Sequence, residues 1–182
     1  ANITVRLLRN GVDTGLTDDT DTSGNYDINI TSLNGSISNG DIFTLYLDNE
    51  TPNGVLVATV NTNGLNAYSG FDFSSNQIVL LQEGSTAFTN TILDTAHNGD
   101  TDIAALYTNG GGVNLTTVTG SSLILDDDST YTPGGTLTIP GNFYMYSGTT
   151  FNAGANAITL GGNLQSLGTF THTGTITFNN SA

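Results

Sequence analysis

The residues that could do chemistry in this chain are its aspartates, which gather in three loop-like stretches. Ca²⁺ takes about six to eight oxygen ligands from carboxylates and carbonyls, so loops dense in Asp and Asn can form a site for it. None of the stretches has the spacing of an EF-hand loop or of the nonapeptide calcium repeat. Calcium is therefore a candidate cofactor that the sequence does not require. The candidate ligands are Asp18, Asp19 and Asp21, then Asp94, Asp100 and Asp102, then Asp126, Asp127 and Asp128.

Groups suited to catalysis are scarce. The two histidines, His97 and His172, are far apart in the sequence, whereas catalysis needs acids, bases or nucleophiles positioned together. Neighbouring carboxylates could serve a glycosidase, but these fall between predicted strands, where Asp usually bonds to its own backbone in a turn. A β-helical lyase would need a basic residue, and the second half of the chain has no Lys or Arg. We therefore predict that the protein is not an enzyme.

The charge balance excludes several classes of partner. Sixteen acidic residues oppose only two basic ones, Arg6 and Arg9, for a net charge of −14 over 182 residues. Nucleic acids and anionic membranes bind basic surfaces, so neither is expected. No apolar run approaches the roughly 20 residues that span a bilayer, so we expect no membrane insertion. Cysteine is absent, which excludes disulfides and thiolate metal sites.

Apolar and polar residues alternate with period two along the chain, with Gly, Asn, Asp or Ser between the alternating runs. This pattern predicts an all-β protein without a helix longer than one turn. Short strands at this spacing favour a β-sandwich, and we assign an Ig-like or prealbumin-like sandwich domain to residues 1–84. The strands expected in this domain are residues 2–9, 25–30, 42–48, 54–61, 67–73 and 76–82.

Residues 85–182 contain an internal repeat. Segments that begin at Leu115, Leu137, Ile158 and Ile176 align at intervals of about 20 residues, a spacing typical of solenoids. In a solenoid the strands stack on those of the next coil, alternate side chains fill the interior, and Gly or Asn turn the corners. We assign this half to a short β-solenoid. The alternative is a second β-sandwich whose hairpins happen to be similar in length.

Two segments resemble parts of bacterial surface proteins. TDTSGNYDI, followed by the strand IFTLYL, resembles the short sandwich modules of the carboxypeptidase-regulatory-like and Cna-B-like families, with Asp21, Gly24 and Tyr26 in the matching turn. GTFTHTGTITFNNSA is similar to the Gly-Thr-Phe repeats of large surface proteins with β-helical stalks. The resemblance implies a stalk or fibre protein that is extracellular or on the cell surface. In the sandwich families one further strand precedes the strand that begins this chain.

The two ends of the chain are expected to complement each other. The chain begins one strand late for the sandwich family and ends one strand early for the solenoid repeat, so a terminal strand could pair with a neighbouring subunit by β-strand addition. A head-to-tail contact that does not close on itself produces a filament. We predict a structural homopolymer, the alternative being a fragment whose neighbouring domains supply the missing strands. The expected assembly residues are Ile3, Val5 and Leu7, and Thr175, Ile176, Thr177, Phe178 and Asn179.

A carbohydrate-binding or adhesive module is the alternative function. Tyr144 and Tyr146 alternate with Phe143 and Met145, so the two tyrosines point to one face, where they could bind surface glycans or pack on a neighbouring coil. Asn-x-Ser/Thr sequons are candidate glycosylation sites, although a chain rich in Asn and Thr generates them by chance. They lie at Asn2, Asn29, Asn34, Asn49, Asn114 and Asn179.

Overall fold

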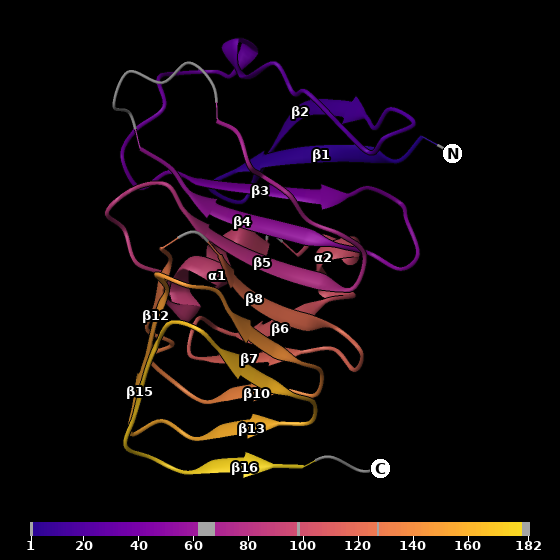
Figure 1. Cartoon of the computed structure of the whole chain (residues 1–182). Coiled ribbons are helices and arrows are strands. Elements are labelled where there is room, and N and C mark those ends of the chain that lie inside the picture. Colours follow the sequence, from indigo (N-terminus) through magenta and orange to yellow (C-terminus); the bar gives the residue numbers. More distant parts are fainter. Residues whose placement is uncertain (1, 62–67, 98, 127, 180–182) are drawn as a thin grey trace.

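The computed structural model describes residues 2–61, 68–97, 99–126 and 128–179 (Figure 1). Strands dominate, which confirms the all-β prediction. The strands of the first half are β1 (Thr4–Arg9), β2 (Val12–Asp19), β3 (Ile42–Leu47), β4 (Val55–Thr59) and β5 (Gln77–Gln82). The strands that follow are β6 (Tyr107–Gly110), β7 (Asn114–Thr117), β8 (Ser122–Asp126), β9 (Thr130–Tyr131), β10 (Leu137–Ile139), β11 (Phe143–Met145), β12 (Thr150–Gly154), β13 (Ile158–Leu160), β14 (Leu164–Ser166), β15 (Thr169–His172) and β16 (Ile176–Phe178). The helices are η1 (Ile30–Ser32), α1 (Asn90–His97) and α2 (Thr101–Ala104).

The second half winds as a three-sided β-solenoid. Each coil contributes one strand to each of three sheets, in the orders β7-β10-β13-β16, β8-β11-β14 and β9-β12-β15, and neighbouring strands run parallel. Leu115, Leu137, Ile158 and Ile176 pair with one another in register along the first of these sheets. The predicted solenoid and its repeat are therefore confirmed. Figure 1 shows the coils stacked from β7 down to β16.

Aromatic side chains stack inside the solenoid. The ring of Phe151 lies between those of Tyr131 and Phe170, at centroid distances of 5.7 and 5.1 Å, and it meets Phe143 edge-on at 5.0 Å. Because inward residues of one coil rest on the same positions of the next, a single coil cannot bury them. Stacking of coils is therefore what forms this core.

Two successive repeats each contain a Gly-Asn pair, Gly141-Asn142 and Gly162-Asn163, at a corner where successive coils touch. A Cβ on Gly141 would lie 2.0 Å from the carbonyl oxygen of Ser121, closer than any real contact. The next residue also bridges the coils, because the Oδ1 atom of Asn142 accepts a 2.9 Å hydrogen bond from the backbone N–H of Asn163. Glycine is required here by close approach of backbones, and asparagine by the hydrogen bond that it adds.

The first half does not form the expected sandwich. Its strands lie in one sheet with a solenoid face, in the order β14-β11-β8-β5-β4-β3-β1-β2, so that the sheet runs across the boundary predicted at residue 84. The cause is the parallel pairing of β4 with β5, because two parallel strands cannot be joined by a tight hairpin, and residues 68–73 of the connection lie over the outer face of the sheet. Within residues 25–30 and 68–73, two segments expected as strands, no strand forms; the two lie over this face instead.

Both faces of this sheet are buried at its centre, so β3 and β4 have no exposed side, whereas the outermost strand β2 is exposed or half-buried along its length. One face continues the interior of the solenoid, and there Ile78 and Leu80 pack in the same cluster as Leu123 and Phe143. The other face forms a second core around Phe43 and Leu45. Residues of 25–30 and 68–73, the two crossing segments, cover this core. A single central sheet thus takes the place of separate domain cores.

Two helices, absent from the sequence-based expectation, cover the solenoid interior at the end nearest β6. Leu93 and Ala96 of α1 and Ile103 of α2 are fully buried in the inner core. Asp100 caps α2 by accepting a 2.8 Å hydrogen bond from the N–H of Asp102. Short, polar helices of this kind carry a weak periodic signal, which is why the sequence suggests turns. Among the described residues no helix is long and apolar enough to cross a membrane.

Candidate functional site

The end of the solenoid formed by β14, β15 and β16 is open within the described residues. Each of these strands is the outermost of its sheet. Their inward side chains Leu164, Phe170 and Ile176 are only half-buried, whereas the equivalent positions one coil earlier are fully buried. An outermost strand presents unpaired N–H and C=O groups to any strand that can add to it. This end, which Figure 1 shows at the bottom, is the first candidate site.

His172 adds unmet hydrogen-bonding capacity to this open end. It lies on the inner side of β15, with its ring centroid 6.4 Å from that of Phe170. Both ring nitrogens are shielded from solvent, and neither has a hydrogen-bond partner among the described residues. A neutral imidazole has one donor and one acceptor, and leaving them unpaired costs free energy. A further layer over this end could supply the missing partners.

Charge is distributed unevenly between the two ends of the molecule. Every acidic residue and both arginines lie within residues 1–128, and residues 129–182 contain no Asp, Glu, Lys or Arg. The last coils therefore carry no acidic side chain and no Lys or Arg. The opposite edge of the eight-stranded sheet is β2, which carries Asp13, Asp18 and Asp19. The molecule thus has an acidic end and a neutral end.

The structure separates the two groups of expected assembly residues. Val5 and Leu7 are each only 1% exposed because they lie in the outer core, against which Ile3 also packs, and the backbone of β1 is paired with β2 and β3. Ile176, Thr177 and Phe178 instead form β16 at an open edge, with Thr175 and Asn179 on either side. Among the described strands the outermost ones are β14, β15 and β16 towards the end of the chain and β2, β6 and β9 elsewhere, whereas β1 is paired on both sides within its own subunit.

The backbone of β16 has one side free for pairing. The N–H of Ile158 donates to the Thr175 carbonyl, and the N–H of Asn179 donates to the Leu160 carbonyl, at 3.0 and 2.7 Å. Backbone groups alternate sides along a strand, so those of Ile176 and Phe178 face away from β13. These two residues supply the donors and acceptors that an added strand would use.

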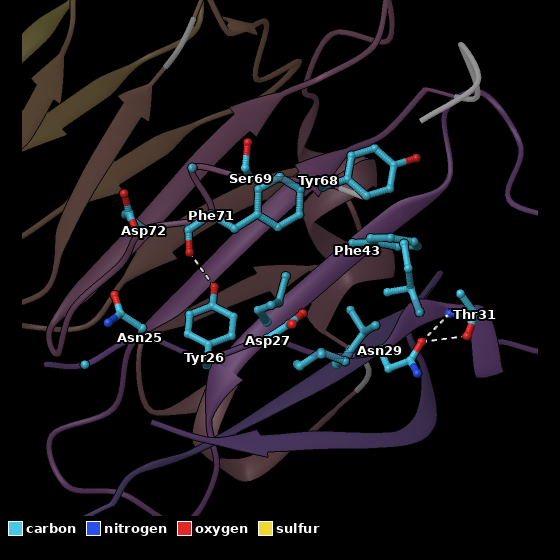
Figure 2. Close-up of a pocket in the computed structure, with 16 residues that line it drawn as sticks. Asn25, Tyr26, Asp27, Asn29, Thr31, Phe43, Tyr68, Ser69, Phe71 and Asp72 are labelled. Atoms are coloured by element: carbon cyan, nitrogen blue, oxygen red, sulfur yellow. Dashed lines mark hydrogen bonds between the residues drawn. The ribbon is translucent and has the colours of Figure 1, made fainter. Parts of the chain in front are cut away.

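A groove of about 500 Å³ on the outer face of the sheet is a second candidate site (Figure 2). Its floor is Leu7, Phe43 and Leu45, and its walls are residues 24–31 and 68–72. The Tyr26 hydroxyl donates a hydrogen bond to the Phe71 carbonyl, which ties the two walls together. Burial, with the nearby charge of Asp72, raises the pKa of Tyr26 well above its usual value, so this donor keeps its proton.

Sequence reasoning did not find this groove, because its walls come from two segments expected to be strands of a sandwich. The predicted turn is present: Gly24, at φ 86°, donates its N–H to the Asp21 carbonyl. The side chain of Asp21 accepts bonds from Asn25 and Ser23, and these hold its pKa below the usual value. The turn leads directly into the wall that carries Tyr26.

The other candidate calcium ligands are dispersed, and several are engaged by neighbouring groups. Asp18 accepts a bond from the Asp27 N–H and Asp19 one from the Thr4 hydroxyl, both at 2.6 Å. Asp102 accepts the Asn49 N–H at 2.9 Å. Asp94 and Asp128 are exposed, Asp126 is half-buried, and Asp127 lies outside the described residues.

Among the described residues no three His, Cys, Asp or Glu side chains gather into a group that could hold a metal ion. Calcium binding stays a prediction, and the melting temperature with and without a chelator tests it.

The candidate glycan-binding tyrosines differ in exposure, and Tyr144 packs against the outer core of the sheet. Tyr146 is 48% exposed and Tyr144 half-buried, whereas Phe143 and Met145 point into the solenoid. All six sequon asparagines are exposed. Glycosylation itself stays a prediction.

No protein-family model, no curated protein and no solved structure matches this chain. The resemblance of the first half to Cna-B-like modules and of the last residues to Gly-Thr-Phe repeats therefore stays a prediction. Function has to be inferred from the geometry of the two candidate sites.

Proposed function

We propose that this protein is an extracellular structural protein, a subunit of a surface filament that assembles head to tail by β-strand addition. The observation that carries the proposal is the last coil, where three strands are each outermost in their sheet and the inward side chains are half-buried. Adding strands to β14, β15 and β16 would bury these side chains and pair their backbone groups. It would also place polar groups within reach of His172.

The direction of assembly follows from the eight-stranded sheet. Its two outermost strands are β14, at the neutral end, and β2, at the acidic end. Two acidic ends would repel each other, whereas a neutral end can approach an acidic one without like-charge repulsion. Pairing β14 of one copy with β2 of the next would continue the sheet from subunit to subunit, and the open edge of β16, in the same coil, would pair with the same neighbouring copy. Such a heterologous contact repeats without closing and builds a filament.

A location on a bacterial surface is part of the proposal and rests on two features. The first is the resemblance of residues 20–28 and of the chain's end to stalk and fibre modules. The second is the layer of residues 24–31 and 68–73 over the sheet, which stands where an Ig-like or prealbumin-like sandwich would have its second sheet. A sheet with both faces covered and its edges free suits a spacer that transmits tension along the strand-pairing direction.

A proline at the free edge tests the assembly mechanism. Phe178→Pro removes the outward-facing N–H of β16 and leaves the bonds to β13 in place, whereas Phe178→Ala removes only the ring. We expect wild-type protein to form filaments as its concentration rises, seen by electron microscopy and light scattering. Phe178→Pro should lower assembly much more than Phe178→Ala. Equal assembly of the two variants, or a wild-type protein that stays monomeric, would rule the mechanism out.

A further inference from the structure

The aromatic groove lies on the outer face of the sheet, away from the open coil formed by β14, β15 and β16, and we propose that it binds a short stretch of a neutral carbohydrate. This activity is separate from the proposed assembly, because it uses the covered face of β1 and β3 and the two crossing segments, whereas assembly uses the edges of β2 and of β14 to β16. The groove has a rigid floor, a flat aromatic ledge and a rim rich in hydrogen-bond acceptors.

The groove is formed before any ligand arrives. Phe43 and Leu7 in its floor are each 1% exposed and belong to paired strands. The bond from Tyr26 to Phe71 fixes the distance between its walls, as Figure 2 shows. A volume of about 500 Å³ lies inside the range of roughly 300–1,000 Å³ that small-molecule sites occupy. A preformed site loses little free energy to ordering when it binds.

Two rings form a ledge along one wall. Tyr68 and Phe71 are nearly parallel, at 22°, with centroids 5.8 Å apart, an offset arrangement that leaves ring faces available. Phe43 supports Tyr68 from the floor through an edge-on contact at 5.6 Å and 82°. Both ledge residues are only half-buried. Flat ring faces of this kind suit the apolar C–H faces of sugar rings.

The polar rim selects for ligands that donate hydrogen bonds. Asp27 and Asp72 offer exposed carboxylate oxygens as hydrogen-bond acceptors, and Asn25 and Asn29 add amide groups. The lining contains no Lys or Arg. Anionic ligands are therefore disfavoured, whereas the hydroxyl groups of a neutral sugar match the acceptors. Aromatic faces beside such acceptors therefore match both features of a sugar ring, its apolar C–H faces and its hydroxyl groups.

An inserted peptide strand fits this groove less well. A strand between the two walls would need their backbone groups as partners. The Tyr26 hydroxyl, however, already occupies the Phe71 carbonyl and crosses the space between the walls. A ligand that rests on the Tyr68 and Phe71 ledge avoids this obstruction.

Binding is tested with a panel of neutral hexasaccharides derived from cellulose, xylan, mannan, chitin and β-1,3-glucan, by saturation-transfer NMR and calorimetry. We expect at least one of them to bind wild-type protein. Tyr68→Ala and Asp72→Asn should each weaken that binding by about tenfold, the effect of losing one good contact. Tyr146→Ala, which removes the exposed tyrosine of the alternative glycan-binding face on the solenoid, is the control that separates the two sites and should leave the affinity unchanged.

Several results would overturn the proposal: no hexasaccharide binds, the two groove variants bind as well as wild type, or the control loses binding. Preferential binding of tetramethylammonium, or of a synthetic peptide of residues 171–179, would assign the groove to a cation or a strand. Should Tyr68→Ala fail to fold, the exposed and nearly isosteric Asp72→Asn decides the matter. Phe178→Pro should still bind the sugar, so failure of assembly and failure of binding are distinguishable.

Discussion

Leu160 and Phe178 occupy the same position in successive coils and pair in register, yet Leu160 is fully buried and Phe178 is 61% exposed. The two side chains differ in what covers them, because β13 has a paired strand on each side and β16 has one on a single side among the described residues. The burial of an inward residue in this solenoid therefore depends on the following coil.

This difference predicts unequal costs of truncation. Leu160→Ala should lower the free energy of unfolding by about 2–5 kcal/mol, because it leaves a cavity in a packed interior. Phe178→Ala should cost about 1 kcal/mol or less in the monomer, since most of the ring is already in water. Urea unfolding at a concentration below that of assembly measures both. Similar losses for the two variants would show that Phe178 is buried in solution.

Glycine at the coil corners should be essential where backbones touch. Gly141→Ala would place a methyl group 2.0 Å from the Ser121 oxygen, so successive coils must separate, at a cost of about 1–3 kcal/mol or more. Gly110→Ala is the control, because its nearest neighbour, the Asn114 oxygen, lies at 3.9 Å. Its effect should stay within about 0.5 kcal/mol. Thermal melting of the two variants beside wild type makes the comparison.

The Arg9 and Asp41 pair predicts a loss of stability in acid. Burial would raise the pKa of Asp41, but hydrogen bonds from Asn10, Ser38 and Arg9 outweigh it and lower that pKa below its usual 3.8. The native state then binds fewer protons than the unfolded state. This contribution to stability is complete above the unfolded pKa and is lost as the pH falls through the lower, folded pKa.

Asp41→Asn should therefore destabilise the protein at neutral pH by about 1–3 kcal/mol. The difference from wild type should shrink as the pH falls below about 4. Urea unfolding between pH 7 and pH 2 measures it, with the exposed Asp94→Asn as a control. A difference that stays constant over this range would mean that Asp41 acts without its charge.

The neutral end of the solenoid predicts a charge effect on assembly. Thr177 is exposed on β16. Thr177→Lys should strengthen association with the acidic end of the next subunit, and Thr177→Glu should weaken it. Added salt should reduce both effects, because it screens exposed charges. Light scattering at low and high ionic strength measures them, and equal behaviour of the two variants would argue against contact with an acidic surface.

Trypsin should cut the native protein slowly. Its two cleavage sites, Arg6 and Arg9, lie in β1, which is paired on both sides, and both side chains form salt bridges, Arg6 with Asp48 and Arg9 with Asp41. Cleavage requires local unfolding of this strand. Intact mass during digestion should show full-length protein long after a urea-unfolded sample is cut. Rapid cleavage under native conditions would show that β1 opens readily.

Much of the second half could be predicted from the sequence. Leu115, Leu137, Ile158 and Ile176 recur at nearly constant intervals because each must face the same interior, and the structure pairs them in register. The Gly-Asn steps have a similar local cause, since a corner with another backbone against it admits no side chain. In a repeat, the residues that contact each other between coils recur at a fixed spacing in the sequence, so periodicity alone reveals these contacts.

The first half and the groove could not be read in this way. Alternation of side chains marks β1, β3, β4 and β5 as strands but is the same whether they form a sandwich or one sheet. That choice was made by the parallel pairing of β4 with β5 and of β5 with β8, contacts between segments far apart in the chain. Tyr26 and Phe71 likewise meet only because both crossing segments lie on one face of that sheet. Local pattern determines which residues turn inward, whereas long-range pairing decides which of them meet.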